Sequence, residues 1–506
     1  MEMDMLGKPW WKPLCHKGAR KNVLKQGIGC LLSIALVGMT VMASPIVLAD
    51  FSRLGQLQQK GFVISAEARL LDGSKATLGS INAQELRSPA SVTKAYLTAA
   101  ALSRFGPQHR FTSRLVSLAE PNSNGVLQGD LIFDGGGDPG LTSEDLWRLV
   151  QRLRQAGVRE IRGGLVVNQW RFGPVECLTT DRCNARTRVD NSYSAPLSSA
   201  GVNFGSWCVN VAPAATAGQS ANITHCDGPT SLTRIENNVI TKPDNSGTEL
   251  SAVRVTDAAG DVMRISGQIS TNAMARDVYR GASDSAQQTA ETLNAMLIQA
   301  GITLTAAPRV TAERPPQWAN TLAAVDGKPL QELLLRTMNY SNNYMADVMA
   351  LNLVETPRAE LHQAGQALEA FAASLPGHGP ATFESGSGLT TSNRTSAHGV
   401  NVMLESMFHE TALFPSFVAA FQSPANGVMR FIRRGSDTFQ NNVMIKTGTL
   451  NEPFAVRAAG GYFRTATGRW GVFSIMVNGN ASTPYLSWSD VLVPLSQDLD
   501  AMILAN

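Results

Sequence analysis

A serine and a lysine three residues apart, Ser91 and Lys94, are the side chains of this chain that are best placed to do chemistry. They stand at the start of an apolar, alanine-rich stretch that predicts a helix, and residues three apart lie on one face of a helix. This spacing brings an amine to a serine hydroxyl, which needs a base to become a nucleophile. Residues 91–94 also fit a serine near a helix start and a solvated lysine in the first turn, so the catalytic interpretation needs support from the rest of the chain.

Two further segments give that support. Ser341 and Asn343 lie between two helix-like stretches, and Lys446-Thr447-Gly448-Thr449 follows an apolar run that predicts a strand. Lysine is also scarce, because the chain has six lysines beyond residue 49 and two of them are Lys94 and Lys446. The motifs Ser-x-x-Lys, Ser-x-Asn and Lys-Thr-Gly in this order are the signature of penicillin-binding proteins and serine β-lactamases.

Over residues 50–506 the chain resembles the class C low-molecular-mass penicillin-binding proteins, the D-alanyl-D-alanine carboxypeptidase/endopeptidase group. Besides the three motifs, the resemblance rests on segments 129–131 with 136–139, 193–197 with 202–204, and 386–389. It implies an α/β (α+β) fold, in which a serine β-lactamase/DD-transpeptidase-like domain with an antiparallel sheet and helices is interrupted by large, mainly-β inserted domains. We expect a signal peptide in 1–49, the DD-peptidase domain in 50–105 and 301–506, and the insertion in 106–300.

The resemblance also implies roles for the residues of the first two motifs. Ser91 attacks the carbonyl between two D-alanines, and Lys94 acts as the base, with a pKa depressed near a second lysine and away from bulk water. Ser341 passes a proton towards the leaving amine. Asn343 holds the substrate amide and contacts Lys94.

The third motif is implied to bind the substrate. Lys446 supplies positive potential and Thr447 a hydroxyl for the terminal carboxylate, while Gly448 and Thr449 complete the binding strand. The backbone N–H groups of Ser91 and Thr449 form the oxyanion hole. The expected ligands are peptidoglycan peptides, with β-lactam antibiotics as inhibitors.

At two positions the resemblance to the family does not assign a single role. Asp190 lies just before Tyr193, in a neighbourhood that approaches the active site in this family, and could bind the free amine of a diamino acid or be a turn aspartate. Related sequences often carry Ser-Arg after Gly-Ser-Gly-Leu, whereas this chain has Thr390-Thr391, with Arg394 nearby.

The beginning of the chain has the order of a secretory signal peptide. Six basic residues precede an apolar run at 28–39, and small-residue sites follow at Ala43 and Ala49. Cleavage at either site predicts a periplasmic protein without a strong membrane anchor, while an uncleaved anchor is the alternative because 27–49 could just span a bilayer. Without 1–49 the chain has 37 basic and 38 acidic residues, so no general attraction to nucleic acid is expected.

Four cysteines remain after residue 49, at positions 177, 183, 208 and 226. Export permits disulfides, and neighbour pairing, Cys177–Cys183 and Cys208–Cys226, is favoured among three possible connectivities. A zinc site is the alternative, although the spacings are not paired Cys-x-x-Cys. The seven histidines do not cluster, and we expect no metal and no cofactor.

The elements that position the motifs follow from patterning. Helices are expected at 142–156, where Thr142 and Asp145 resemble a capping pair, and at 283–300. Antiparallel strands are expected at 443–449, 456–463 and 470–477, followed by a helix at 491–504.

Two other functions compete with a DD-peptidase. A β-lactamase would use the same acylation chemistry, but the chain has no convincing Glu-x-x-Leu-Asn segment for rapid deacylation, and the insertion also disfavours it. A catalytically silent cell-wall scaffold would not need the intact motif residues.

Overall fold

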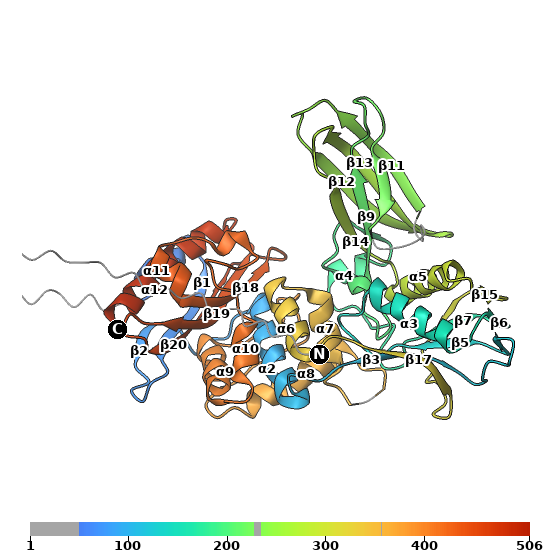
Figure 1. The fold of residues 1–506 in the computed structure, drawn as a ribbon. Coiled ribbons are helices and arrows are strands. Elements are labelled where there is room, and N and C mark those ends of the chain that lie inside the picture. The colour runs from blue at the N-terminus through green and yellow to red at the C-terminus, as the bar shows by residue number, and fades with distance from the viewer. Residues whose placement is uncertain (1–49, 227–233, 356) are drawn as a thin grey trace, which may run out of the picture. The chain divides into compact units, whose positions relative to one another are not determined.

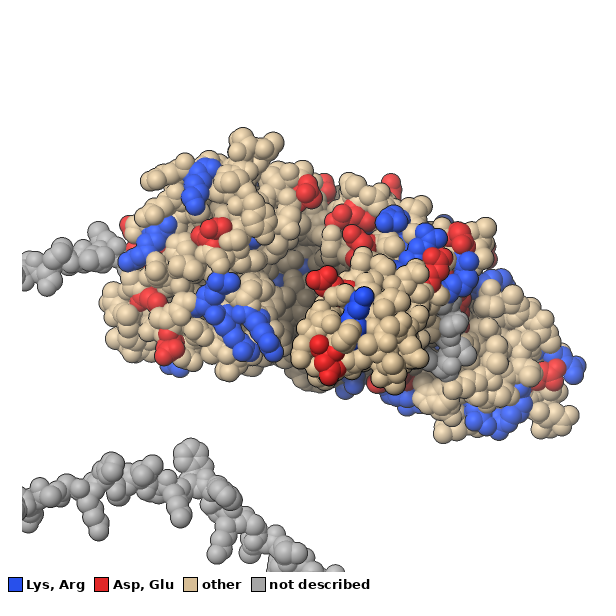
Figure 2. Space-filling view, turned by 90° about the horizontal axis from the view of Figure 1, so that it is seen from above, with Lys and Arg blue, Asp and Glu red and all other residues tan. Residues whose placement is uncertain are grey.

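The structure of the 506-residue chain is a computed structural model that describes residues 50–226, 234–355 and 357–506 (Figure 1). The predicted signal peptide, residues 1–49, lies outside this described part. Across these residues, no helix combines the length and apolar character needed to cross a membrane. On the face shown in Figure 2, basic and acidic side chains are interspersed, and neither sign dominates.

The Lys-Thr-Gly motif lies on the edge strand of a five-stranded sheet in which every neighbouring pair is antiparallel. The order of the strands is β18 (Val443–Leu450), β19 (Val456–Arg464), β20 (Trp470–Asn478), β1 (Val63–Leu70) and β2 (Thr77–Ile81). The three predicted C-terminal strands are confirmed. Because β1 pairs with β20, the sheet joins the beginning and the end of the described chain.

Alternating side chains bury both faces of this sheet. Ala458 and Val472 pack with one set of helices, and their neighbours Ala459 and Phe473 pack with another, because successive residues of a strand point to opposite faces. The first set is α2 (Thr93–Phe105), α6 (Leu330–Asn339), α7 (Asn343–Leu351), α8 (Leu361–Ala373), α9 (Ala397–His409) and α10 (Phe414–Ala419). The second set is α1 (Ser52–Gly55), α11 (Asp437–Asn442) and α12 (Trp488–Ala505), which confirms the predicted C-terminal helix. Figure 1 shows α9 and α12 on opposite sides of the sheet.

Part of the region between α2 and α6 is a mixed sheet covered by helices. Its order is β16 (Arg309–Thr311), β7 (Leu165–Asn168), β5 (Leu131–Asp134), β3 (Thr112–Ser117) and β17 (Asn320–Asp326). A small parallel sheet lies in the same region and consists of β15 (Thr303–Leu304), β6 (Glu160–Ile161) and β4 (Val126–Leu127). The covering helices α3 (Ser143–Gln155) and α5 (Ser285–Gln299) share a core with these strands. Both helices were predicted, and α3 has the expected capping box of Thr142 and Asp145.

Two further β-sheets complete the region between α2 and α6. One is β10 (Asn222–His225), β9 (Ser206–Ala212) and β14 (Arg276–Gly281), and the other is β11 (Arg234–Lys242), β13 (Gly260–Ser270), β12 (Glu249–Asp257) and β8 (Arg188–Val189). Apolar side chains of the two sheets meet in one core, among them Val209, Val239 and Ile265. The short helix α4 (Thr180–Asn184) precedes β8.

The sheets of the region between α2 and α6 extend beyond residue 300. β16 pairs with β7, and β17 pairs with β3. We therefore propose that the catalytic domain resumes at α6 rather than at residue 301, and that the insertion runs from β3 to β17.

Candidate active site

The Ser-x-x-Lys motif spans the junction of a single 3-10 turn, Ala90–Val92, with helix α2. Ala90 has a left-handed backbone (φ 44°), and its carbonyl accepts a hydrogen bond from the Thr93 hydroxyl (2.8 Å). Left-handed residues other than glycine cost about 1–3 kcal/mol each and collect at functional sites. The turn leaves Ser91 partly accessible while Lys94 enters the protein interior.

Lys94 is completely buried, and its amine has three oxygen neighbours. Its Nζ lies 2.9 Å from Ser91 Oγ, 2.8 Å from Asn343 Oδ1 and 2.6 Å from the Ser387 carbonyl oxygen. Burial, and after it the charge of Lys446, holds the pKa of Lys94 well below its ordinary value of 10.5. A neutral amine has two N–H donors for the amide and carbonyl oxygens, and its lone pair then faces the Ser91 hydroxyl. The arrangement is suited to removing the proton of Ser91.

The Ser-x-Asn motif forms the corner between α6 and α7. Ser341 has a left-handed backbone (φ 52°), and Asn343 is the first residue of α7. Asn343 Oδ1 accepts from Lys94, and its Nδ2 donates to the Tyr193 carbonyl (3.3 Å). Asn342, the middle residue of the motif, caps α7 by accepting a hydrogen bond from the backbone N–H of Met345 (2.9 Å). The Asn342 side chain therefore serves the helix.

The Lys-Thr-Gly motif supplies a second buried amine. Lys446 Nζ lies 2.9 Å from Ser341 Oγ and 2.6 Å from the Thr447 carbonyl. Burial lowers the pKa of Lys446 from 10.5 to about 7. Thr449 is exposed, and its hydroxyl accepts from the indole N–H of Trp488 (2.9 Å). The motif residues thus continue the site from Ser341 along the edge strand β18.

Gly448 allows this strand to pass against the start of α2. A Cβ at this position would lie 2.6 Å from the Pro89 carbonyl oxygen and 2.8 Å from the Ser91 backbone nitrogen. Because real Cβ atoms are essentially never within 3.0 Å of such atoms, a larger residue would push β18 away from Ser91. The structure therefore brings Ser91, Lys94, Ser341, Asn343 and Lys446 together from three distant parts of the chain.

Asp190 is not in direct contact with this group. It is exposed, and its Oδ1 accepts from Asn191 Nδ2 (3.4 Å). It lines a hollow of about 390 Å³ together with Asp181 and Arg188. The link to the site is Tyr193, three residues further on, whose carbonyl accepts from Asn343.

Two arginines bear on what the sequence suggested. Arg394, the nearest arginine to Thr390-Thr391, donates to the Thr391 carbonyl. Arg182, which no sequence motif indicates, forms a buried ion pair with Asp347 (2.6 Å). Asp347 follows Asn343 by one helical turn, and this spacing on an apolar helix was a signal that could have identified it. For Arg182 the sequence offers no comparable pattern.

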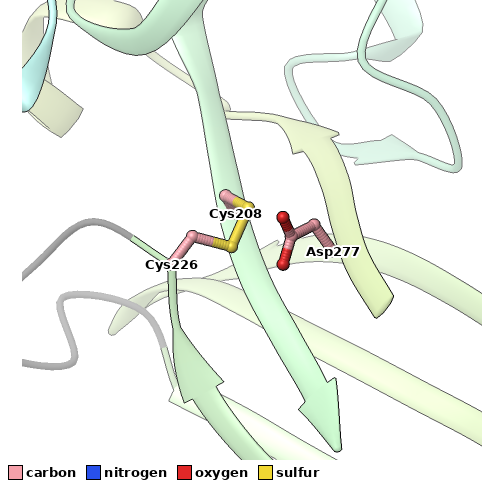
Figure 3. A group of neighbouring side chains, drawn as sticks. All are labelled: Cys208, Cys226 and Asp277. Carbon is pink, nitrogen blue, oxygen red and sulfur yellow. A yellow bond between two sulfur atoms is a disulfide. The ribbon is translucent and has the colours of Figure 1, made fainter. Parts of the chain in front are cut away.

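The cysteines form the two predicted disulfides, Cys177–Cys183 and Cys208–Cys226. Asp277 lies beside the second bond (Figure 3), and the three side chains are close enough to have been candidate metal ligands. The metal ligand would be the thiolate of cysteine, whereas these sulfurs are bonded to each other. The zinc alternative for Cys208 and Cys226 is therefore wrong.

Comparison with known proteins agrees with the motifs. The model of the D-Ala-D-Ala carboxypeptidase 3 (S13) family matches residues 55–493. A D-alanyl-D-alanine carboxypeptidase from Actinomadura sp. (strain R39) is 27% identical over 492 residues, covering 91% of this chain and 88% of that protein. The D-alanyl-D-alanine carboxypeptidase DacB of Haemophilus influenzae is 24% identical over 433 residues, covering 77% of this chain and 80% of that protein.

A solved structure extends the comparison to the fold. The crystal structure of penicillin binding protein 4 (dacB) from Haemophilus influenzae has a TM-score of 0.70 at 22% identity and covers 89% of this chain and 98% of that chain. The likeness therefore includes the long region between α2 and α6 as well as the five-stranded sheet.

Proposed function

This chain belongs to the D-Ala-D-Ala carboxypeptidase 3 (S13) family, a serine peptidase family, and we propose that it cleaves peptidoglycan peptides through an acyl-enzyme on Ser91. The observation that carries the proposal is the contact between Ser91 Oγ and the buried amine of Lys94 at 2.9 Å. A base with a lowered pKa next to a serine hydroxyl is what nucleophilic catalysis requires.

In acylation, neutral Lys94 takes the proton of Ser91 while Oγ attacks the carbonyl carbon between the two D-alanines. The backbone N–H groups of Ser91 and Thr449 stabilise the resulting oxyanion. The C–N bond then breaks, and the proton that Lys94 took from Ser91 passes through the Ser341 hydroxyl to the leaving amine. Ser341 is suited to this step because its hydroxyl lies 2.9 Å from the amine of Lys446. Addition of water to the acyl-enzyme releases the shortened peptide and restores Ser91.

The strand β18 recognises the end of the substrate in this proposal. Lys446 and the Thr447 hydroxyl meet the terminal carboxylate, and Gly448 and Thr449 border the peptide. With the free-enzyme pKa of Lys446 lowered to about 7 by burial, an arriving carboxylate raises that pKa and favours the charged amine. Binding of the carboxylate and protonation of Lys446 therefore support each other.

The leaving group sets the reaction type. Release of D-alanine is carboxypeptidase action, and release of a cross-linking diamino acid is endopeptidase action. Asp190 is proposed to meet the free amine of the diamino acid, because it lines a hollow with a second carboxylate, Asp181, beside Tyr193.

Penicillin binding and a periplasmic location belong to the same proposal. The penicillin binding protein 4 of Haemophilus influenzae has been solved in complex with a β-lactam and shares the fold, with a TM-score of 0.67 at 20% identity. The signal-like order of residues 1–49 supports export to the compartment where peptidoglycan is accessible.

Incubation with a labelled penicillin, followed by peptide mapping, tests the proposal. We expect a stable label on Ser91 and neither label nor peptidase activity in Ser91→Ala. The control is Ser74→Ala, a substitution of an exposed serine, which should behave like the unmodified protein. Rapid turnover of the label would favour a β-lactamase, absence of label a silent scaffold, and label on another serine of Ser91→Ala a different nucleophile.

A further inference from the structure

A buried ion pair connects the region between α2 and α6 to the helix that carries Asn343. Arg182 on α4 and Asp347 on α7 have side chains that are 4% and 0% exposed, and Arg182 Nη1 lies 2.6 Å from Asp347 Oδ2. Arg182 Nε and Nη2, and also Asp347 Oδ2, have no hydrogen-bond partner in the described part of the protein, so the contact is one between charges. The guanidinium therefore depends on this one carboxylate.

The other oxygen of Asp347 leads to the amine of Lys94. Asp347 Oδ1 accepts from the backbone N–H of Ser387 (2.7 Å), and the carbonyl of the same residue accepts from Lys94 Nζ (2.6 Å). Two hydrogen bonds thus connect the ion pair to the proposed base, and both belong to the Ser387 backbone. A displacement of Asp347 would move an oxygen that orients the Lys94 amine.

The charges of the pair also act on Lys94 from opposite directions. Besides burial and Lys446 on β18, which both lower the pKa of Lys94, Asp347 raises it and Arg182 lowers it. Within the described residues, these are the charged groups that bear on Lys94, and they come from three elements, β18, α7 and α4. Asp347 without Arg182 would favour the charged ammonium, which cannot accept the proton of Ser91.

Stability alone is a weak reason for this pair. Taking two charges out of water costs several kcal/mol per ion, and a buried ion pair is often no more stable than apolar residues of the same size. A role in catalysis would explain the pair differently, because the positive charge of Arg182 would then be needed to offset the negative charge of Asp347 near Lys94.

We propose that Arg182 is a positioning residue for acylation, because its ion pair fixes Asp347 and the Ser387 backbone beside the Lys94 amine and offsets the charge of the Asp347 carboxylate. The inference rests on the proposed function, in which Lys94 is the base for Ser91. It gives the region between α2 and α6 a part in the chemistry, since α4 supplies the arginine.

The test is the pH dependence of Ser91 acylation by a labelled penicillin in four variants. Arg182→Gln leaves Asp347 unbalanced, so the acid limb of the rate profile should move to higher pH by about one unit or more. Asp347→Asn leaves Arg182 unbalanced and should move the limb to lower pH. The double variant removes both charges, so its acid limb should lie within a few tenths of a pH unit of that of the unmodified protein. Arg182→Lys keeps the positive charge and should leave the acid limb at the same pH.

Each outcome distinguishes a positioning role of the ion pair in acylation from a purely structural role. Limbs that stay in place in Arg182→Gln and Asp347→Asn, or that move in the same direction, would overturn the inference and leave a structural ion pair. If Arg182→Gln does not fold, Asp347→Asn and the double variant still decide, because the first must lower the limb and the second must restore it. Failure of the unmodified protein to acquire label on Ser91 would instead reject the proposed function itself.

Discussion

The proposed active site has two sides, and each holds one buried lysine in different surroundings. On the helical side, formed by Ser91, Lys94 and Asn343, the amine has three oxygen neighbours and feels three charges of mixed sign. On the strand side, formed by Lys446, Thr447 and Thr449 on β18, the amine has two oxygen neighbours, and burial is the cause of its lowered pKa. In the proposed function, this difference lets the helical side exchange a proton with Ser91 and the strand side receive an anion.

The largest expected effect separates the two lysines by substrate. Lys94→Met removes the proposed base and should lower acylation by about two to four powers of ten for every substrate. Lys446→Met should lower kcat/KM by about one to two powers of ten for peptides with a free C-terminal carboxylate, because a charge-assisted contact is lost. A matched peptide with a C-terminal amide should lose less in Lys446→Met.

The measurement is kcat/KM for the paired peptides in both variants. Lys328→Met, which replaces an exposed lysine, is the control and should leave both rates unchanged. Equal losses for the carboxylate and amide peptides in Lys446→Met would contradict the division between the two sides.

A smaller effect on acylation is expected from removal of the disulfides, one of which lies next to Arg182 and so stabilises the helical side. Cys177–Cys183 closes a short loop next to Arg182, whereas Cys208–Cys226 lies in the sheet of β9 and β10. Replacing each pair by serines should destabilise the protein by roughly 2 and 3 kcal/mol respectively, from the lengths of the closed loops. Only the loss of Cys177–Cys183 should also slow Ser91 acylation, because it frees α4.

Urea unfolding and penicillin labelling of the two double-serine variants distinguish these effects. The Cys208–Cys226 variant serves as the control, since it is the more destabilised of the two and should still acylate normally while folded. Normal acylation in the Cys177–Cys183 variant would show that α4 holds Arg182 without the disulfide.

The sequence was most informative where function restricts both residue type and spacing. Ser91 and Lys94 could be paired from the helical period, and the strands that carry Lys446 could be predicted from their apolar runs. Pairing between distant segments was harder to foresee. β17 lies beyond the predicted end of the insertion and yet pairs with β3, because a strand sequence does not specify its partner.

Arg182 illustrates the same limit at the site. Arginine is usually solvent-exposed, and its burial depends on a partner, which here is supplied by a helix far along the chain. An arginine beside a cysteine in a turn-rich segment has no local feature that predicts this contact. The contact between Lys94 and the Ser387 carbonyl could not be predicted either, because every residue has a backbone carbonyl and the residue type does not show which one is used.

The narrowest expected effect, limited to one class of substrate, concerns Asp190, which lies outside both sides of the site and is proposed to bind a part of the substrate that penicillins lack. Asp190→Ala should lower kcat/KM by about 10- to 100-fold for peptides with a free diamino-acid amine, and acetylation of that amine should abolish the difference from the unmodified protein. Penicillin acylation should stay nearly normal, because Asp190 makes no hydrogen bond with Ser91, Lys94 or Lys446 in the described structure. Asp244→Ala, which replaces an exposed aspartate in the turn between β11 and β12, is the control. Equal losses for free and acetylated peptides, or no loss for either, would make Asp190 a turn residue, and amine recognition would then have to come from elsewhere in the hollow.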